Sequence, residues 1–181
     1  MKKRLLLLVS VLLCGCQTVS RPAPPEVALG AGLNWTLPSL SWVTEPVDKT
    51  QQVVAWHGDN RWQLVGQLSL HADKMTLTAL SDFGTFLFQT SFDGRQFTAR
   101  RSPLMPAKAD TKHLLADLLM ALMPEPALAK SLAPLGVKVE TQHQQRLLRK
   151  NGQILVAISY HPKGFQFEQR QLGYGFKVTY E

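Results

Sequence analysis

Cysteine is scarce in this sequence: the 181-residue chain has two, Cys14 and Cys16, separated by Gly15. A structural zinc site needs four ligands, and no third cysteine supplies one at finger-like spacing. A disulfide across a single glycine would be strained, and no other cysteine offers a partner. These absences exclude a disulfide-stabilised scaffold and a cysteine-rich metal site. They indicate instead that the CGC segment marks processing.

Sequence motifs of catalysis are also missing. There is no HExxH metal motif, no GxSxG nucleophile turn and no glycine-rich phosphate loop. The triplet DFG at residues 82–84 lacks the other kinase motifs, and a turn at the start of a strand explains it better. We therefore predict no catalytic residue, no metal ligand and no cofactor. The five histidines are scattered along the chain: His57, His71, His113, His143 and His161.

Long hydrophobic runs are absent after the N-terminus. Residues 5–13 are apolar except for Ser10, and they follow the basic residues Lys2, Lys3 and Arg4. A short basic segment before 7–15 apolar residues is typical of a secretory signal. The run is too short to cross a bilayer, which needs about 20 residues. We predict a signal peptide over residues 1–15 that is removed.

The segment Leu13-Cys14-Gly15-Cys16 resembles the lipobox of bacterial lipoproteins. The resemblance implies that Cys16 becomes the N-terminus and carries acyl chains, which anchor the protein when two or more are present. An aspartate after the cysteine holds enterobacterial lipoproteins in the inner membrane, so Gln17 implies sorting to the outer membrane. The expected location is the periplasmic face of the outer membrane of a Gram-negative bacterium, with the membrane as a partner.

The excess of positive charge is weak once the signal is removed. The formal charge of +7 falls because residues 1–15 carry three basic side chains and no acidic one, which leaves 17 basic and 13 acidic residues. The densest basic group, Arg100, Arg101, Lys108 and Lys112, has no interleaved aromatic residues such as a nucleic-acid surface uses. We predict no nucleic-acid partner. A solvated charged face, or contact with anionic lipid headgroups, explains this group.

The mature chain fits one domain. Residues 16–49 are interpreted as the lipidated N-terminus, a tether rich in proline and glycine over residues 20–32, and an entry segment. From residue 50 to residue 181, apolar and polar residues alternate with period two between turn sequences. This alternation is typical of antiparallel strands with one buried face, and it predicts about nine or ten of them.

The turn sequence Asp93-Gly94 predicts a hairpin with a two-residue type I′ loop that pairs Phe92 with Arg95. The apolar side chains of this hairpin then share one face, whereas a shift of one residue would divide them. These side chains are Phe86, Phe88, Phe92, Phe97 and Ala99.

A second hairpin is predicted at Asn151-Gly152, which places Leu147 opposite Val156. The segments FQFEQ and YGFKVTY supply the last two strands, each with its aromatic residues on one side.

Two helices are predicted between the hairpins. Asp110 or Thr111 can cap the first helix, which Pro124 ends. The second, shorter helix is expected to begin at Pro126 and to stop before Pro134.

The first helix is apolar on nearly every side, because Asp117 is the one residue between 114 and 123 that is not apolar. Such a helix is buried on more than one side, so we expect it to cross the open side of a curved sheet. For Asp117 we expect exposure to solvent, or pairing with Lys112 or His113, rather than contact with a ligand headgroup.

Several features together resemble a bacterial lipoprotein family of uncharacterised function, often encoded beside aryl-polyene or other fatty-acid-like biosynthesis genes. They are the lipobox, the strands with one apolar face, the segment LTALSDFGTFLFQTSFDG, the apolar helix pair and the ending NGQILVAISY to GYGFKVTY. The pattern is similar to that of the lipoprotein receptor LolB and its periplasmic partner LolA. The resemblance implies a mainly β (α+β) fold: an incomplete β-barrel over residues 50–181, whose two short helices lid or fill an apolar cavity that receives acyl chains.

The apolar face of sheet and helix permits two interpretations, a closed core or a surface that binds a ligand. If the face binds a ligand, the protein binds or transfers a lipid-like molecule (an acyl chain, an aryl polyene or the acyl chains of a lipoprotein). The helices then gate the cavity, and a periplasmic carrier protein is a possible partner. If the face is a closed core, the protein is a structural lipoprotein that docks an envelope biosynthetic or transport machine. The candidate ligand-binding residues are Trp62, Leu64, Leu77, Phe86, Phe88, Phe97, Leu115, Leu118, Leu119, Leu122, Phe167 and Phe176.

Overall fold

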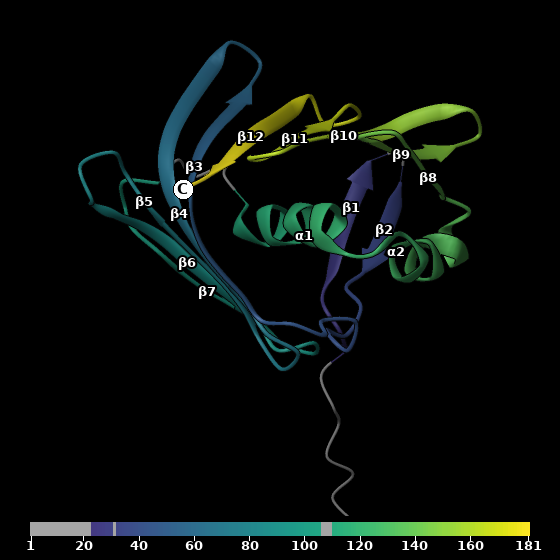
Figure 1. Ribbon diagram of the computed structural model, residues 1–181, viewed down its shortest axis with the longest axis horizontal. Helices are drawn as coiled ribbons and strands as arrows, with labels where there is room; N and C mark the ends of the chain where they lie inside the picture. Colours follow the sequence, from purple (N-terminus) through teal and green to yellow (C-terminus); the bar gives the residue numbers. More distant parts are fainter. Residues whose placement is uncertain (1–22, 31, 106–109) are drawn as a thin grey trace, which may run out of the picture.

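The computed structural model describes residues 23–30, 32–105 and 110–181. The predicted signal peptide, the lipidation site Cys16, the sorting residue Gln17 and Lys108 lie outside these residues. Ten strands form one antiparallel sheet in the order β7-β6-β5-β4-β3-β12-β11-β10-β9-β8. The sheet curves around α1 without closing, so the predicted fold class, a curved antiparallel sheet with two short helices on its concave side, is confirmed (Figure 1).

The sheet has two halves. The first half consists of β7 (Phe97–Arg101), β6 (Phe86–Phe92), β5 (Met75–Leu80), β4 (Asn60–Leu70) and β3 (Val47–His57). The second half consists of β12 (Tyr174–Tyr180), β11 (Gly164–Gln169), β10 (Gln153–His161), β9 (Gln145–Lys150) and β8 (Lys138–Gln142). The C-terminal strand β12 pairs with β3 and so joins the two halves at the centre of the sheet.

The tether prediction is wrong where the structure describes a strand within it. β1 (Glu26–Gly30) pairs with β2 (Leu33–Thr36), and this small sheet lies on the concave side of the large one (Figure 1). Val27, Leu29 and Trp35 are each about 1% exposed. Their period-two spacing makes one face of β1 and β2 apolar, and this face packs into the core, which outweighs the proline and glycine content of the segment.

The hairpin between β6 and β7 exists, but its loop is longer than predicted. Phe92 pairs with Phe97 rather than with Arg95, so the loop has four residues. The Asp93 carboxylate accepts hydrogen bonds from the backbone N–H groups of Arg95 and Gln96, at 2.9 and 2.6 Å, and this fixes the longer loop. A shift of two residues keeps the side chains from Phe88 to Ala99 on their predicted faces. The prediction for Phe86 is wrong, because the register shift between Ala79 and Leu80 places it on the other face, where its ring lies 4.8 Å from the Arg100 guanidinium.

The second hairpin has the predicted two-residue turn, with positive φ angles at Asn151 and Gly152. The pairing of Leu147 with Val156 is wrong, however, because the register shifts between Ile154 and Val156. This β-bulge places Val156 opposite Leu148.

The helices begin and end close to the predicted residues. α1 (Thr111–Leu122) is capped by Asp110, whose side chain accepts from the backbone N–H of Lys112 at 2.8 Å, and it ends just before Pro124 as expected. α2 (Glu125–Leu132) begins one residue earlier than predicted and continues into the 3₁₀ turn η1 (Ala133–Leu135). α1 crosses the concave side of the sheet and α2 lies near β8 (Figure 1).

Candidate ligand-binding site

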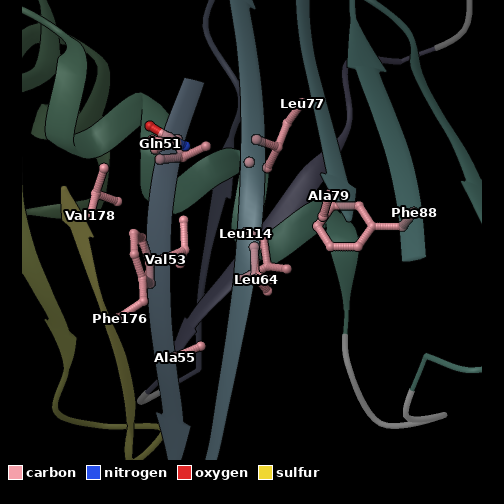
Figure 2. Close-up of a pocket in the computed structure, with 12 residues that line it drawn as sticks. Gln51, Val53, Ala55, Leu64, Leu77, Ala79, Phe88, Leu114, Phe176 and Val178 are labelled. Carbon is pink, nitrogen blue, oxygen red and sulfur yellow. The ribbon is translucent and has the colours of Figure 1, made fainter. Parts of the chain in front are cut away.

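A pocket lies between α1 and the centre of the large sheet (Figure 2). Its walls come from β3, β4, β5, β6, β12 and α1, and eleven of its twelve lining residues have no polar side-chain atom. The lining residues are Gln51, Val53, Ala55, Leu64, Gly66, Leu77, Ala79, Phe88, Leu114, Leu118, Phe176 and Val178.

Small residues on three positions of the concave face create the pocket. Gln51, Gly66, Ala79 and Phe88 stand directly opposite one another on four neighbouring strands, β3 to β6. Gly66 and Ala79, in the middle of this row, do not reach α1 as a leucine or phenylalanine would. Ala55 has the same effect two rows further along β3.

The pocket is narrow and has a closed end. Its volume is about 460 Å³ with the solvent at its mouth included, of which about 60 Å³ can be reached by the centre of a water molecule. One water needs about 10–15 Å³ by that measure, so the space suits several waters or part of one hydrocarbon chain. Gln51, Gly66 and Leu118 are buried, whereas Leu64 and Leu114 are partly exposed, so the mouth lies on the side of the latter two.

Gln51 is the one polar side chain in the lining, and it is 1% exposed. Neither its amide oxygen nor its amide nitrogen has a hydrogen-bond partner among the residues that the structure describes. Gly66 makes room for it, since a Cβ atom at Gly66 would lie 3.1 Å from Gln51 Nε2. A buried amide without partners costs about 1–3 kcal/mol, so Gln51 needs an explanation.

The C-terminal turn of α1 is held by polar side chains of the sheet. The Nη1 atom of Arg146, on β9, donates to the carbonyl oxygens of Met120 and Met123, both at 2.8 Å. Tyr160, on β10, donates its hydroxyl to the carbonyl of Ala121 at 2.8 Å. These carbonyls have no partner within the helix, so the two side chains replace the missing hydrogen bonds.

The N-terminal turn of α1 is joined to β1. One ring nitrogen of His113 lies 2.8 Å from Asp110 Oδ2, and the other lies 3.1 Å from the carbonyl oxygen of Ala28. The helix is therefore attached at both ends to parts of the molecule outside the first half of the sheet.

The prediction for Asp117 is wrong. Its side chain is 2% exposed and pairs with neither Lys112 nor His113; instead the Tyr174 hydroxyl donates to Asp117 Oδ2 at 2.7 Å. The carboxyl is therefore buried where the helix meets β12. Burial raises the pKa of Asp117 to about 8, an effect that the Tyr174 hydrogen bond opposes.

The structure brings some of the candidate ligand-binding residues together and separates others. Five line the pocket: Leu64, Leu77, Phe88, Leu118 and Phe176. Three are fully buried in the core: Leu115, Leu119 and Phe167. The other four do not line the pocket: Trp62 is exposed, and Phe86, Phe97 and Leu122 are partly exposed.

Seven lining residues were not predicted, namely Gln51, Val53, Ala55, Gly66, Ala79, Leu114 and Val178. The segment QQVVAW, residues 51–56, has no alternation of polar and apolar residues, so its inward face could not be assigned. The register of β4 and β5 does indicate the positions of Gly66 and Ala79, as small residues among large ones on one face.

Within the described residues, no three His, Cys, Asp or Glu side chains are grouped so that they could hold a metal ion. In the same part of the chain, no helix has the length and apolar character needed to cross a membrane.

Comparison with known proteins places the chain in a family whose function is unknown. None of the curated proteins matches the chain. The profile of one family, described as "Protein of unknown function (DUF3261)", matches residues 48–180, which include all ten strands of the large sheet except the first residue of β3. The chain belongs to this family.

Proposed function

We propose that the protein is a lipoprotein of the outer membrane that faces the periplasm and non-covalently binds or passes on a lipid-like molecule. The observation that carries this proposal is the apolar pocket beneath α1, lined by small residues on neighbouring strands. The open, curved sheet with helices on its concave side also supports a carrier similar to LolA and LolB.

Burial of a hydrocarbon chain supplies the affinity in this proposal. Each methylene group moved from water into an apolar site contributes about 0.8 kcal/mol. Eleven of the twelve lining residues have no polar side-chain atom, so a hydrocarbon chain would meet an apolar surface everywhere except at Gln51. A chain longer than the closed part of the pocket would extend past Leu64 and Leu114 at the mouth.

The contacts of α1 limit how such a pocket would open. Arg146 and Tyr160 attach the C-terminal turn of α1 to β9 and β10. Outward movement of the whole helix would break these hydrogen bonds. We therefore propose that the pocket widens by movement of β3–β6, whose contact with α1 around the pocket is apolar.

Native mass spectrometry of the fragment from residue 17 to residue 181 tests the proposal. The fragment is expected to retain co-purified lipid or to bind added acyl chains. Ala79→Leu would fill the pocket and abolish this binding, whereas Ala99→Leu, on the exposed part of β7, would not. A fragment that binds no lipid, or an Ala79→Leu variant that binds as well as the unchanged fragment, contradicts the proposal.

The lipid anchor has a separate test. Cells grown with labelled palmitate are expected to incorporate it into the protein at Cys16, and Cys16→Ser removes the label while Cys14→Ser does not. Gln17→Asp is expected to move the protein to the inner-membrane fraction. Unlabelled protein, or label retained by Cys16→Ser, contradicts the anchor.

Two exposed apolar side chains favour a second candidate, a lipoprotein that docks an envelope machine. Phe83 is 95% exposed in the turn between β5 and β6, and Leu104 is 69% exposed after β7. Both lie at the same end of the strands, because Ser102 donates its backbone N–H to the carbonyl of Leu87 near the start of β6. A photocrosslinker at position 83 that captures one defined protein, unaffected by Ala79→Leu, would support docking over lipid binding.

A further inference from the structure

Buried glutamine residues occur in both halves of the sheet, and their surroundings differ. Gln169, on β11, is 1% exposed; its amide nitrogen donates to the carbonyl of Leu29 at 3.4 Å and its amide oxygen accepts from the backbone N–H of Gln171 at 3.1 Å. Gln169 is thus a structural residue that joins β11 to β1. Gln51 is equally buried but makes neither kind of hydrogen bond within the described residues.

Gln51 is also the one buried side chain in the described part of the chain whose donor and acceptor are both unpartnered. Its side chain lies beside Gly66, at the end of the pocket whose lining residues are buried (Figure 2 shows Gln51). A structural role does not account for it, since an apolar side chain of similar size would fill the space opposite Gly66 without leaving an amide unpaired. The position suits a group that a ligand completes.

The amide presents an N–H donor and an oxygen acceptor side by side. The best complement is a group with a neighbouring acceptor and donor, as in a carboxamide or a protonated carboxyl group, because two parallel hydrogen bonds then form. A charged head group does not fit: none of the twelve lining residues carries a charge, and an ion buried without a partner is strongly disfavoured.

We propose that the pocket takes a single-chain, uncharged amphiphile whose carboxamide or protonated carboxyl group is held by Gln51 at the closed end. The hydrocarbon chain then runs past Val53 and Ala55 to the mouth. This inference rests on the proposed function, because it names the class of ligand that the same pocket binds.

The test compares decanamide with nonane, which share a nine-carbon alkyl chain and differ in the polar end. Competition against a fluorescent apolar probe is measured on the full chain in nanodiscs, with empty nanodiscs as the blank for partitioning. Two hydrogen bonds in an apolar site are worth roughly tenfold or more in Kd, so decanamide is expected to bind at least about tenfold tighter than nonane. Gln51→Met is expected to remove this preference and to leave nonane binding unchanged or tighter.

Gln52 provides the matched control. It is the next residue on β3, it is exposed, and its Nε2 atom donates to Glu181 Oε1 at 3.0 Å on the other face of the sheet. Gln52→Met is expected to keep the preference for decanamide.

The outcomes separate this inference from the proposed function. If neither compound binds, the proposed function fails and the inference with it. If both bind and Gln51→Met leaves their ratio unchanged, the pocket is a lipid site but the role of Gln51 is wrong. Should Gln51→Met not fold, the unchanged protein decides alone: equal or weaker binding of decanamide than of nonane overturns the inference.

Discussion

Helix α1 meets the two halves of the sheet in different ways. Towards β8–β12, side chains of the sheet donate hydrogen bonds to the helix, from Arg146, Tyr160 and Tyr174. Towards β3–β6, the pocket separates the helix from the strands, and the one polar side chain there, Gln51, has no partner among the described residues. The first contact fixes the helix in place, whereas the second leaves room for another molecule.

The Arg146 contact should matter most to this difference. Arg146 is 7% exposed. Its guanidinium donates two hydrogen bonds to carbonyls at the end of the helix and lies 5.5 Å from the centre of the Tyr160 ring. Arg146→Met leaves these carbonyls buried without donors and is expected to lower the free energy of unfolding by about 2–4 kcal/mol. Urea denaturation followed by circular dichroism measures this.

The control for Arg146 is Arg149→Met on the same strand. Arg149 pairs with Glu140 at 3.2 Å, and both side chains are partly solvent-exposed. Its loss should cost less than about 1 kcal/mol. Equal effects of the two substitutions would show that Arg146 does not fix α1.

The buried carboxyl of Asp117, which contacts the second half of the sheet, should make the stability of the protein depend on pH. Its pKa is about 8 in the folded protein against an ordinary value of 3.8, with burial as the main cause, Tyr174 opposing it and the charge of Asp110 adding to it. The folded state therefore binds more protons than the unfolded state between these values. The free energy of unfolding should fall as the pH rises from about 4 to about 8, by at most about 1.4 kcal/mol per pH unit.

Asp117→Asn removes the titrating group and keeps an oxygen that can accept from Tyr174. Urea denaturation at pH 5 and pH 8 should therefore show a smaller loss of stability for Asp117→Asn than for the unchanged protein. Identical losses would mean that Asp117 is ionised in the folded protein at neutral pH.

Tyr160→Phe should have a smaller effect. It removes the single hydrogen bond to the Ala121 carbonyl and keeps the ring beside Arg146. The expected loss of stability is about 1 kcal/mol, measured by urea denaturation. A loss as large as that of Arg146→Met would mean that Tyr160 and Arg146 act as one unit, which the double variant would show as non-additive.

In both halves of the sheet, the sequence predicts the elements better than it predicts the register between strands. α1 and α2 follow from the capping residue Asp110 and from Pro124, and the strand faces follow from alternation. Register is predicted less well: the carboxylate of Asp93 lengthens one loop, and a bulge after Ile154 shifts one hairpin. Both depend on local hydrogen bonds that a turn sequence alone does not specify.

The pocket was only partly predicted, because it exists where residues with small or no side chains face the helix. Large apolar residues such as Phe88 and Leu118 are conspicuous in the sequence, but Gly66 and Ala79 shape the space, and their importance depends on which strands are neighbours. Asp117 shows the same limit from the other direction. Its partner Tyr174 is 57 residues away along the chain, so the sequence near the helix did not indicate it.

The smallest expected effect on stability comes from filling the pocket. Ala79 and Ala116 are both 0% exposed, but Ala79 borders the pocket and Ala116 lies on α1 within the packed core. Ala116→Leu has no space to enter and is expected to cost about 1–3 kcal/mol, whereas Ala79→Leu can extend into the pocket and should change stability by less than about 1 kcal/mol in either direction. Urea denaturation of the two variants compares them directly. If Ala79→Leu is as destabilising as Ala116→Leu, the space between α1 and β3–β6 is a closed core in solution, and the contrast between the two halves of the sheet disappears.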